Sequence, residues 1–335
     1  MQAAIKAISY YLPPQTLTNA ELSREFPGGG VEKIAAKTGI LERRISDRDT
    51  CSSDLGVESA RRLFAEHGIT PDTIDFVLFC TQSPDYFLPS TACLVQDRLG
   101  IPQTAGALDF NLGSSGFVYG LSLARGLIET GEAQHVLLIT ADTYSKFLAP
   151  GDKSVRTIFG DAAAATLVSA SATGGLGPFV FGTDGRGADN LIVKTGGMRV
   201  RQPVPAASQV TDEFGNVRDD NFLYMNGPEL LNFTLRVVPP LVSALLAKSG
   251  LTIDQIDLFV FHQPNKYLLE TLRKKIKIPP ERFCEHYSHC GNTVSATIPI
   301  ALYHARQQGR MGAGRRLLLA GFGGGYSWAG CLVTM

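Results

Sequence analysis

GITPDTIDFVLFCTQSPD, residues 68–85, recurs in the second half of the chain as GLTIDQIDLFVFHQPN, residues 250–265. A second pair, ARGLIETGEAQHVLLIT (124–140) and ARQQGRMGAGRRLLLAG (305–321), aligns at nearly the same offset. Self-similarity at a fixed offset indicates a duplicated structural unit. The chain is therefore predicted to consist of an N-terminal half, residues 1–172, and a related C-terminal half, residues 173–335.

Short apolar runs alternate with longer segments of helical periodicity, which is the pattern of an α/β fold. Strands are expected at the start of the chain and at residues 76–80, 136–140, 258–262 and 317–321. Helices are expected at residues 53–67, 89–99, 115–130, 228–248, 266–276 and 295–308. Two related α/β units would pack as a pseudo-twofold pair. The loops that carry Ser114, His262 and Asn292 should then meet at one cleft.

Composition excludes several classes of function. The 335 residues contain 31 Lys plus Arg and 31 Asp plus Glu, so no net charge favours nucleic acid or an anionic membrane. No apolar run is expected to be long enough to span a bilayer, and the first residues of the sequence lack the features of a secretory signal. Six cysteines without paired spacing are expected to be reduced thiols in the cytoplasm. No cluster has metal-ligand spacing, so no metal is expected.

The segment DFNLGSSGFVYG, residues 109–120, places Ser114 just before the expected helix 115–130. Unpaired N–H groups at a helix N-terminus stabilise an anion, and there they would lower the pKa of a cysteine by a little over one unit. A serine hydroxyl is far less acidic and needs a general base within hydrogen-bond reach. Taken alone, Ser114 fits a helix N-cap as well as a nucleophile.

Three further segments could contribute to a site. His262 ends an apolar run, and Asn292 lies in a glycine-containing turn; each alone fits a structural role as well as a chemical one. The glycines of 321–330 permit close approach of backbone to a ligand, but their spacing fits no nucleotide-binding loop. Residues 195–221 are polar and turn-rich, which favours a flap over the cleft or a plain surface excursion.

Seven segments in chain order together resemble the ketoacyl-acyl carrier protein (ACP) synthase III family of the thiolase superfamily. They are TGILERR (38–44), PSTAC (89–93), DFNLGSSGFVYG (109–120), FGDAAAA (159–165), FHQPN (261–265), CGNTVSAT (290–297) and FGGGYSW (322–328). The resemblance implies a five-layer αβαβα fold, a homodimer and a Cys-His-Asn triad. The implied reaction is a decarboxylating Claisen condensation of an acyl thioester with a malonyl thioester.

His262 and Asn292 fall on the second and third places of that triad, whereas Ser114 stands where the family has its cysteine. Two explanations remain open: an inactivating Cys→Ser replacement, which we favour, or a natural serine nucleophile activated by His262. The resemblance also implies an oxyanion hole formed by backbone N–H groups of Ser114 and Gly324. Asp161, in FGDAA, is expected to order its loop rather than to react.

The resemblance implies no resident cofactor, because the phosphopantetheine thioesters of CoA or ACP are the substrates. The substrate-binding positions carried over from the family are Gly227, Asn265, Lys153 and Leu88. Family members often stack the CoA adenine between Trp and Arg, but Lys33 and Lys153 stand at those places, which favours an acyl-ACP donor. Basic residues near His262 fit an acidic carrier protein or a solvated face; they are Lys266, Arg273, Lys274 and Lys275.

Two other functions remain as alternatives. One is an acyltransferase of the same fold that moves an acyl group to a hydroxyl or amine, with Ser114 as nucleophile. The other is a non-catalytic partner that only binds acyl chains. The presence of both His262 and Asn292 favours condensation over either alternative, because malonyl decarboxylation needs two donors that simple transfer or binding does not require.

Overall fold

The protein is described here from a computed structural model that covers residues 2–205 and 208–335. Two mixed β-sheets form its framework. The first has the order β1-β7-β6-β4-β5, with strands Gln2–Tyr11, Ala162–Ser171, His135–Asp142, Phe76–Cys80 and Gly106–Phe110. The second has the order β13-β14-β15-β8, with strands Leu258–Phe261, Arg316–Gly323, Ser327–Thr334 and Gly175–Thr183.

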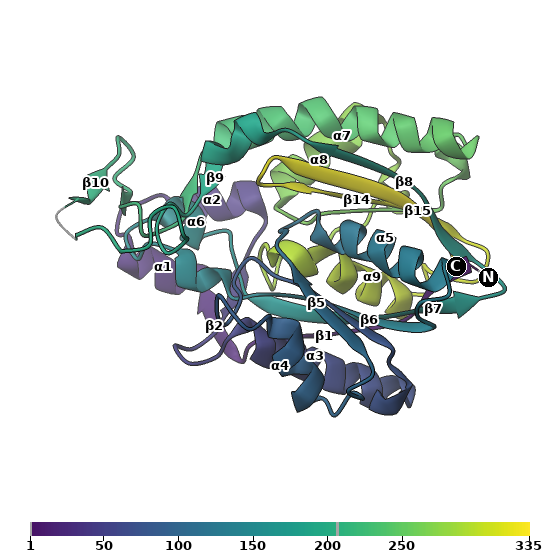
Figure 1. The fold of residues 1–335 in the computed structure, drawn as a ribbon. Coiled ribbons are helices and arrows are strands. Elements are labelled where there is room, and N and C mark those ends of the chain that lie inside the picture. The colour runs from purple at the N-terminus through teal and green to yellow at the C-terminus, as the bar shows by residue number, and fades with distance from the viewer. Residues whose placement is uncertain (1, 206–207) are drawn as a thin grey trace.

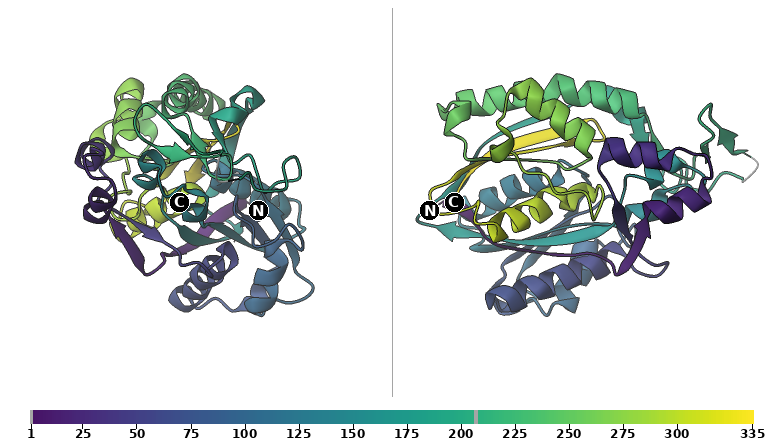
Figure 2. Two further views of the ribbon diagram at one scale, coloured as in Figure 1. Left: turned by 90° about the vertical axis from the view of Figure 1, so that its left-hand side faces the viewer. Right: turned by 180° about the vertical axis from the view of Figure 1, so that it is seen from behind.

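Helices cover both sheets and fill the space between them (Figures 1 and 2). The pair between the sheets is α5 (Gly116–Glu129) and α9 (Thr297–Gln307). The outer face of the first sheet carries α3 (Ser52–His67) and α4 (Thr91–Arg98). The outer face of the second carries α7 (Gly227–Ser249) and α8 (Lys266–Ile276). The predicted five-layer αβαβα architecture is therefore confirmed.

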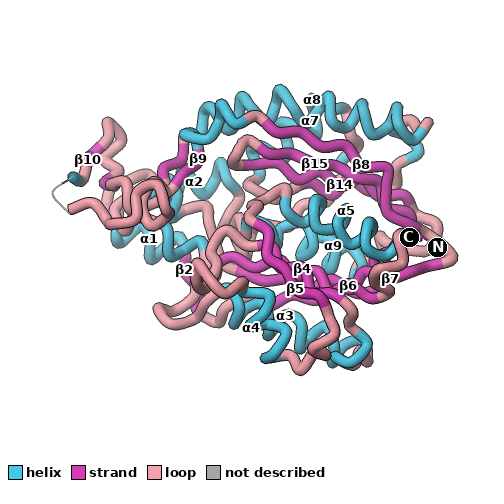
Figure 3. Tube along the Cα trace, in the orientation of Figure 1, coloured by secondary structure: helices cyan, strands magenta, loops and turns pink. Residues whose placement is uncertain are grey.

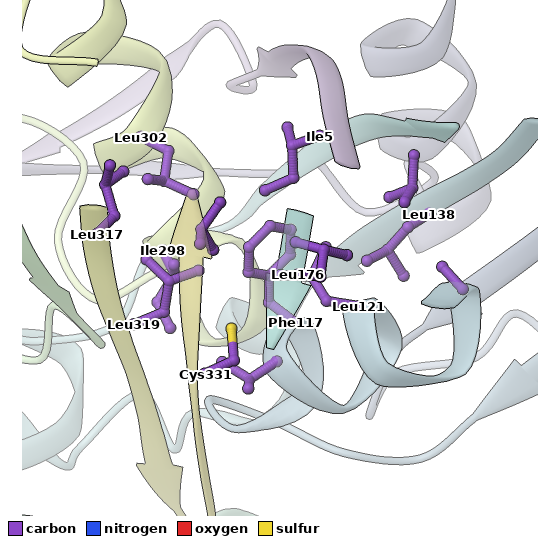
Figure 4. Close-up of a cluster of buried hydrophobic side chains, with 14 of the residues drawn as sticks. Ile5, Phe117, Leu121, Leu138, Leu176, Ile298, Leu302, Leu317, Leu319 and Cys331 are labelled. Atoms are coloured by element: carbon purple, nitrogen blue, oxygen red, sulfur yellow. The ribbon is translucent and has the colours of Figure 1, made fainter. Parts of the chain in front are cut away.

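The central layer is held by apolar side chains from both halves of the chain (Figure 4). Phe117 and Leu121 of α5 meet Ile298 and Leu302 of α9, and all four are fully buried. Leu319 of β14 closes the same cluster from the second sheet. Burying a Leu, Ile or Phe side chain contributes roughly 1.5–3 kcal/mol. These two helices therefore fix the loops at their N-termini relative to both sheets.

The repeated segments occupy matching places in the two sheets. In the first, β4 pairs with β6 in parallel, and in the second, β13 pairs with β14 in parallel. Cys80 ends β4, and His262 directly follows β13. Figure 3 shows the observed helices and strands. The expected elements lie within a few residues of the observed bounds. Pro228 lies in the first turn of α7, where the missing N–H would be unpaired in any case. The half boundary at residues 172 and 173 remains a prediction.

The expectation that no apolar run is long enough to span a bilayer is wrong for helix α7. Among the described residues, it is the one helix whose length and composition would allow it to cross a membrane. Core helices of soluble proteins pass the same test, and α7 contains Pro239 and Pro240. Its buried residues, which include Phe233 and Leu241, belong to the cluster that covers the second sheet. Helix α7 is accordingly part of the outer layer.

Smaller elements gather at one end of the layers, on the left in Figure 1. They are β2 (Gln15–Thr18), α1 (Asn19–Glu25), α2 (Val31–Thr38), β3 (Glu42–Ile45), α6 (Lys153–Arg156), β9 (Leu191–Ile192), β10 (Val210–Thr211), β11 (Val217–Arg218) and β12 (Tyr224–Met225). The short 3-10 helices that lie wholly within the described residues are Pro71–Thr73, Tyr144–Phe147, Gly185–Asn190, Ile253–Gln255, Pro280–Arg282 and Val294–Ala296.

The segment 195–221, predicted as a flap or a surface excursion, is anchored where the structure describes it. Arg218 forms ion pairs of 2.8 Å with buried Asp152 and 2.6 Å with Asp212. The amide of Val217 donates to the carbonyl of Gly151 at 3.0 Å. Residues 206 and 207 of this segment lie outside the described residues. The hairpin β10–β11 thus rests on the loop that precedes α6.

Candidate active site

A cavity of about 150 Å³ lies where loops of both halves meet. Ser114, His262 and Asn292 all line it, as the duplicated fold led us to expect. Much of the remaining lining is apolar and includes Leu231 and Phe322. A largely apolar cavity with a few convergent polar groups is the usual form of a small-molecule site.

Ser114 lies one residue further from the helix than expected. Helix α5 begins at Gly116 and its N-cap is Ser115, so the N-cap interpretation of Ser114 is wrong. The hydroxyl of Ser115 instead bonds to that of Ser327 at 2.9 Å in the interior. A Cβ placed on Gly323 would lie 3.2 Å from Oγ of Ser114. Ser114 therefore projects toward the end of β14, and any side chain at position 323 would crowd its hydroxyl.

His262 is buried at the carboxyl end of β13. Its Nδ1 lies 2.8 Å from Oγ1 of Thr297, the first residue of α9. Burial lowers the pKa of His262 to about 3, because the charged imidazolium would lose its hydration. No carboxylate among the described residues hydrogen-bonds to the ring. His262 is therefore neutral at physiological pH.

Asn292 is buried, and its amide is fixed by its own loop. Oδ1 accepts a hydrogen bond of 3.0 Å from the amide of Val294, which leaves Nδ2 as the group able to donate into the cavity. The backbone of Asn292 also bonds to the carbonyl of Ile158 and the amide of Gly160. These bonds tie the C-terminal loop to the segment that follows α6.

Two buried aspartates organise the surrounding loops. Asp142, at the end of β6, accepts hydrogen bonds from the amides of Gln82 at 2.8 Å and Ser295 at 3.2 Å. Burial raises the pKa of Asp142 to about 7. Asp161 accepts from the amides of Ser46 and Ser145, and burial raises its pKa as well. Asp161 is not among the residues that line the cavity, in agreement with a role in ordering its loop.

The predicted substrate-binding residues divide into two groups. Gly227 and Asn265 line the cavity, and Oδ1 of Asn265 also caps α8 by accepting from the amide of Leu268. Gly324, which the resemblance places in the oxyanion hole, lines the cavity too. Lys153 and Leu88 do not line it. The ammonium of Lys153 donates to the carbonyl of Phe214 in the hairpin, and Leu88 is 82% exposed.

The predicted docking residues lie on α8, whose N-cap Asn265 and first-turn residue Leu268 line the cavity. Glu270 lies 3.9 Å from the ammonium of Lys266 and 4.0 Å from that of Lys274. Arg273 donates to the carbonyl of Ile278 at 3.1 Å, so its side chain also ties down the segment that follows the C-terminus of α8. Lys275 is exposed. Lys266 directly follows Asn265, whereas at 1.5 Å per residue Arg273 lies about 12 Å along the helix from Asn265.

Sequence reasoning missed three cavity-region groups: Gln82, Tyr144 and Thr297. The hydroxyl of Tyr144 donates to Oε1 of Gln82 at 2.8 Å, and both side chains line the cavity. Gln82 directly follows the repeated strand segment at the position that corresponds to Pro264, two residues after His262. The repeat could have pointed to Gln82, whereas Tyr144 and Thr297 carry no such signal.

Comparison with known proteins settles the family. Models of 3-oxoacyl-[acyl-carrier-protein] synthase III match residues 108–185, and models of its C-terminal part match residues 246–335. Beta-ketoacyl-[acyl-carrier-protein] synthase III 3 of Streptomyces coelicolor is 37% identical, with 96% of this chain and 94% of the relative aligned. This chain belongs to the 3-oxoacyl-[acyl-carrier-protein] synthase III family.

Other synthase III relatives agree with this assignment. The enzyme named beta-ketoacyl-[acyl-carrier-protein] synthase III of Clostridium perfringens is 35% identical over 96% of both chains. A crystal structure of a 3-oxoacyl-(acyl-carrier-protein) synthase III is 55% identical, with a TM-score of 0.96 and full coverage of both chains. A priming beta-ketosynthase of the R1128 polyketide pathway is 28% identical, with a TM-score of 0.86 over 99% of this chain and 96% of its own.

The described residues contain no group of three or more His, Cys, Asp or Glu side chains that could hold a metal ion. The cavity itself presents hydroxyl, imidazole and amide groups, through Ser114, His262 and Asn292. These groups can donate and accept hydrogen bonds and, at position 114, carry an acyl group.

Proposed function

We propose that the protein catalyses the decarboxylating Claisen condensation of an acyl thioester with a malonyl thioester to give a 3-oxoacyl product. The observation that carries this proposal is the convergence of Ser114, neutral His262 and the oriented amide of Asn292 in one largely apolar cavity. Membership of the synthase III family supports it. The phosphopantetheine arm of the carrier is part of the substrate, and the proposal includes no resident cofactor.

Decarboxylation needs two hydrogen-bond donors and no nucleophile. Nε2–H of His262 and Nδ2–H of Asn292 would donate to the thioester oxygen of the malonyl group. As the bond to the carboxylate breaks, its electron pair moves into the thioester and CO₂ leaves. The two donors stabilise the resulting enolate oxygen, and they do so best in a site that excludes water. The enolate carbon then attacks the acyl carbonyl held at position 114, which releases the 114 side chain.

Acyl loading is the step that serine impairs. A serine hydroxyl must lose its proton to attack a thioester, and this requires a competent base. His262 has a pKa lowered to about 3 by burial and no carboxylate partner among the described residues, so it is a weak base. We therefore favour a chain impaired in loading over an acyltransferase that uses Ser114 as its nucleophile. A partner that only binds acyl chains would not decarboxylate malonyl thioesters.

The carrier and the assembly are part of the same proposal. The basic residues of α8 are proposed to dock an acidic ACP, as the names of the relatives suggest for their own partners. Acyl-ACP or acyl-CoA would supply the acyl group. Strand β5 is an edge of the first sheet, and the exposed Tyr86 and Phe87 line a surface pocket together with Phe110 of that strand. Leu88, the next residue, is exposed as well. An apolar edge of this kind supports a homodimer, and we expect the enzyme to act in the cytoplasm.

The test compares the Ser114 protein with its Ser114→Cys variant. Each is exposed to acyl-CoA and acyl-ACP thioesters and examined by intact-mass spectrometry, followed by assay of condensation with malonyl-ACP. We expect the cysteine variant to gain one acyl group and to turn over at least 100-fold faster, because a thiolate forms far more readily than an alkoxide. Equal turnover of the two proteins would identify serine as a competent nucleophile and contradict the impaired-loading interpretation.

A further inference from the structure

A second cavity continues from the first beyond Ser114. The two share Gln82, Tyr144, Leu191 and Gly324 in their walls, but none of His262, Asn292 and Asn265 borders the second one. The pantetheine arm and the acyl chain are attached to different positions of the trigonal thioester carbonyl, so an arm that enters past Asn265 and presents its carbonyl at Ser114 directs its acyl group onward. The shared wall is therefore the first surface that the acyl group meets, a step that rests on the function proposed above.

This shared wall contains a fixed polar pair. The hydroxyl of Tyr144 donates to Oε1 of Gln82 at 2.8 Å, which orients the amide, and the backbone amide of Gln82 is bonded to Asp142. A Cβ on Gly113 would lie 2.5 Å from Oε1, so this amide sits directly against the residue before Ser114. Within the described chain, Nε2 of Gln82 has no hydrogen-bond partner, and Gln82 is half-buried.

An alkyl chain against this wall would cover an unpaired amide donor and gain no hydrogen bond in return. Leaving a buried donor unpaired costs roughly 1–3 kcal/mol, and sites built to bond a polar substrate group reject its apolar isostere. An oxygen on the acyl chain could accept from Nε2 of Gln82. A hydroxyl there could in addition donate to the phenolic oxygen of Tyr144.

We propose that Gln82 and Tyr144 select acyl donors that carry an oxygen within a few bonds of the thioester carbonyl, such as 3-hydroxyacyl or 3-oxoacyl groups. In this assignment Gln82 is the specificity-determining residue. Tyr144 positions it, because the phenol occupies Oε1 and leaves Nε2 facing the acyl chain.

The test uses two pantetheine thioesters that differ by one isosteric group, 3-hydroxybutyryl and 3-methylbutyryl. Their loading rates are measured on the Ser114→Cys protein by intact mass, and their dissociation constants on the Ser114 protein by calorimetry. We expect a preference of about 10-fold for 3-hydroxybutyryl, which corresponds to the net free energy of one or two neutral hydrogen bonds. Gln82→Glu keeps the bond from Tyr144 but replaces the donor by a carboxylate, and should abolish or reverse that preference.

Gln82→Leu should favour 3-methylbutyryl, and Gln103→Leu, an exposed glutamine away from both cavities, should retain the parent preference. Equal use of both thioesters by the parent, or a preference that survives both Gln82 variants, overturns the inference while the condensation function stands. If neither thioester loads or binds, the inference falls together with the proposed function.

Discussion

At the scale of single residues, Thr297 is the hydrogen-bond partner of the His262 ring. Its Oγ1 lies 2.8 Å from Nδ1 of His262 and 3.1 Å from the carbonyl oxygen of Val294. One hydroxyl proton can serve only one of these acceptors. When it is donated to Nδ1, Nε2 carries the proton and can donate to a thioester oxygen. The proposed decarboxylation therefore requires the threonine hydroxyl to donate its proton to Nδ1 and not to the carbonyl of Val294.

We predict that Thr297→Val lowers the rate of malonyl decarboxylation about 10-fold, because the imidazole loses the partner that fixes its tautomer. Thr297→Ser keeps the hydroxyl and should retain most of the parent rate. The rates are measured as CO₂ release from malonyl-ACP, with thermal denaturation as a check on folding. If the serine variant fails as badly as the valine variant, Thr297 acts through packing and not through its hydroxyl.

At the scale of elements, α8 carries the docking prediction. Reversal of Lys274 and Lys275 to Glu should raise KM for malonyl-ACP about 10-fold with little change in kcat, and the effect should fade at high salt. KM for malonyl-pantetheine, which lacks the carrier protein, should not change.

The matched control for this experiment reverses Arg315 and Arg316, which are exposed at the start of β14, at the opposite end of the strand from Gly323. Arg316 lies six residues along the strand from Phe322, which lines the cavity, and is therefore about 20 Å away from it. The docking prediction is contradicted if both double variants raise KM for malonyl-ACP to a similar extent, or if the α8 pair does not change it at low ionic strength. The basic residues of α8 would then form an ordinary solvated surface.

The elements that could be predicted from sequence are those with strong periodicity or an internal copy. β4 and β13 were found because their apolar runs repeat, and α8 because its caps and amphipathic spacing agree. β7 was not, because AAAATLVSAS is built from small residues that show neither alternation nor bulk. It is a strand because β1 and β6 pair with it on both sides. Pairing partners of this kind lie far away in the sequence.

The same limit applies to the candidate site. Ser114, His262 and Asn292 could be identified through motifs, and the structure brings them to one cavity. Tyr144 lies in a short 3-10 helix, and its link to Gln82 depends on where β6 ends beside β4. Such contacts between loops depend on packing, which single-sequence patterns do not contain.

At the scale of the whole molecule, buried His262 links stability to pH. Its pKa is about 3 in the folded chain and about 6.5 when unfolded, so between these values the unfolded state binds the extra proton. The contribution of neutral His262 to the free energy of unfolding is complete above pH 6.5 and is lost as the pH falls toward 3. From pH 7 to pH 5 the loss is about 2 kcal/mol.

His262→Gln should remove this part of the acid sensitivity, measured as the free energy of unfolding in urea at pH 7 and pH 5. The exposed His67→Gln variant is the control and should behave as the parent does. His286, whose pKa burial lowers to about 4, acts in the same direction in all three proteins. An equal loss in the His262→Gln variant and the parent would show that His262 does not titrate in this way.

The central claim is that His262 and Asn292 stabilise an enolate independently of position 114. Release of labelled CO₂ from malonyl-ACP by the Ser114 protein tests it most directly, in comparison with His262→Ala, Asn292→Ala and the double variant. We predict CO₂ release by the Ser114 protein with no acyl-enzyme formed, and a loss on the order of 10²–10³ for each single variant. The double variant should lose less than the product of the two, because both donors serve one oxygen. Single variants that release CO₂ as fast as the Ser114 protein would contradict the claim.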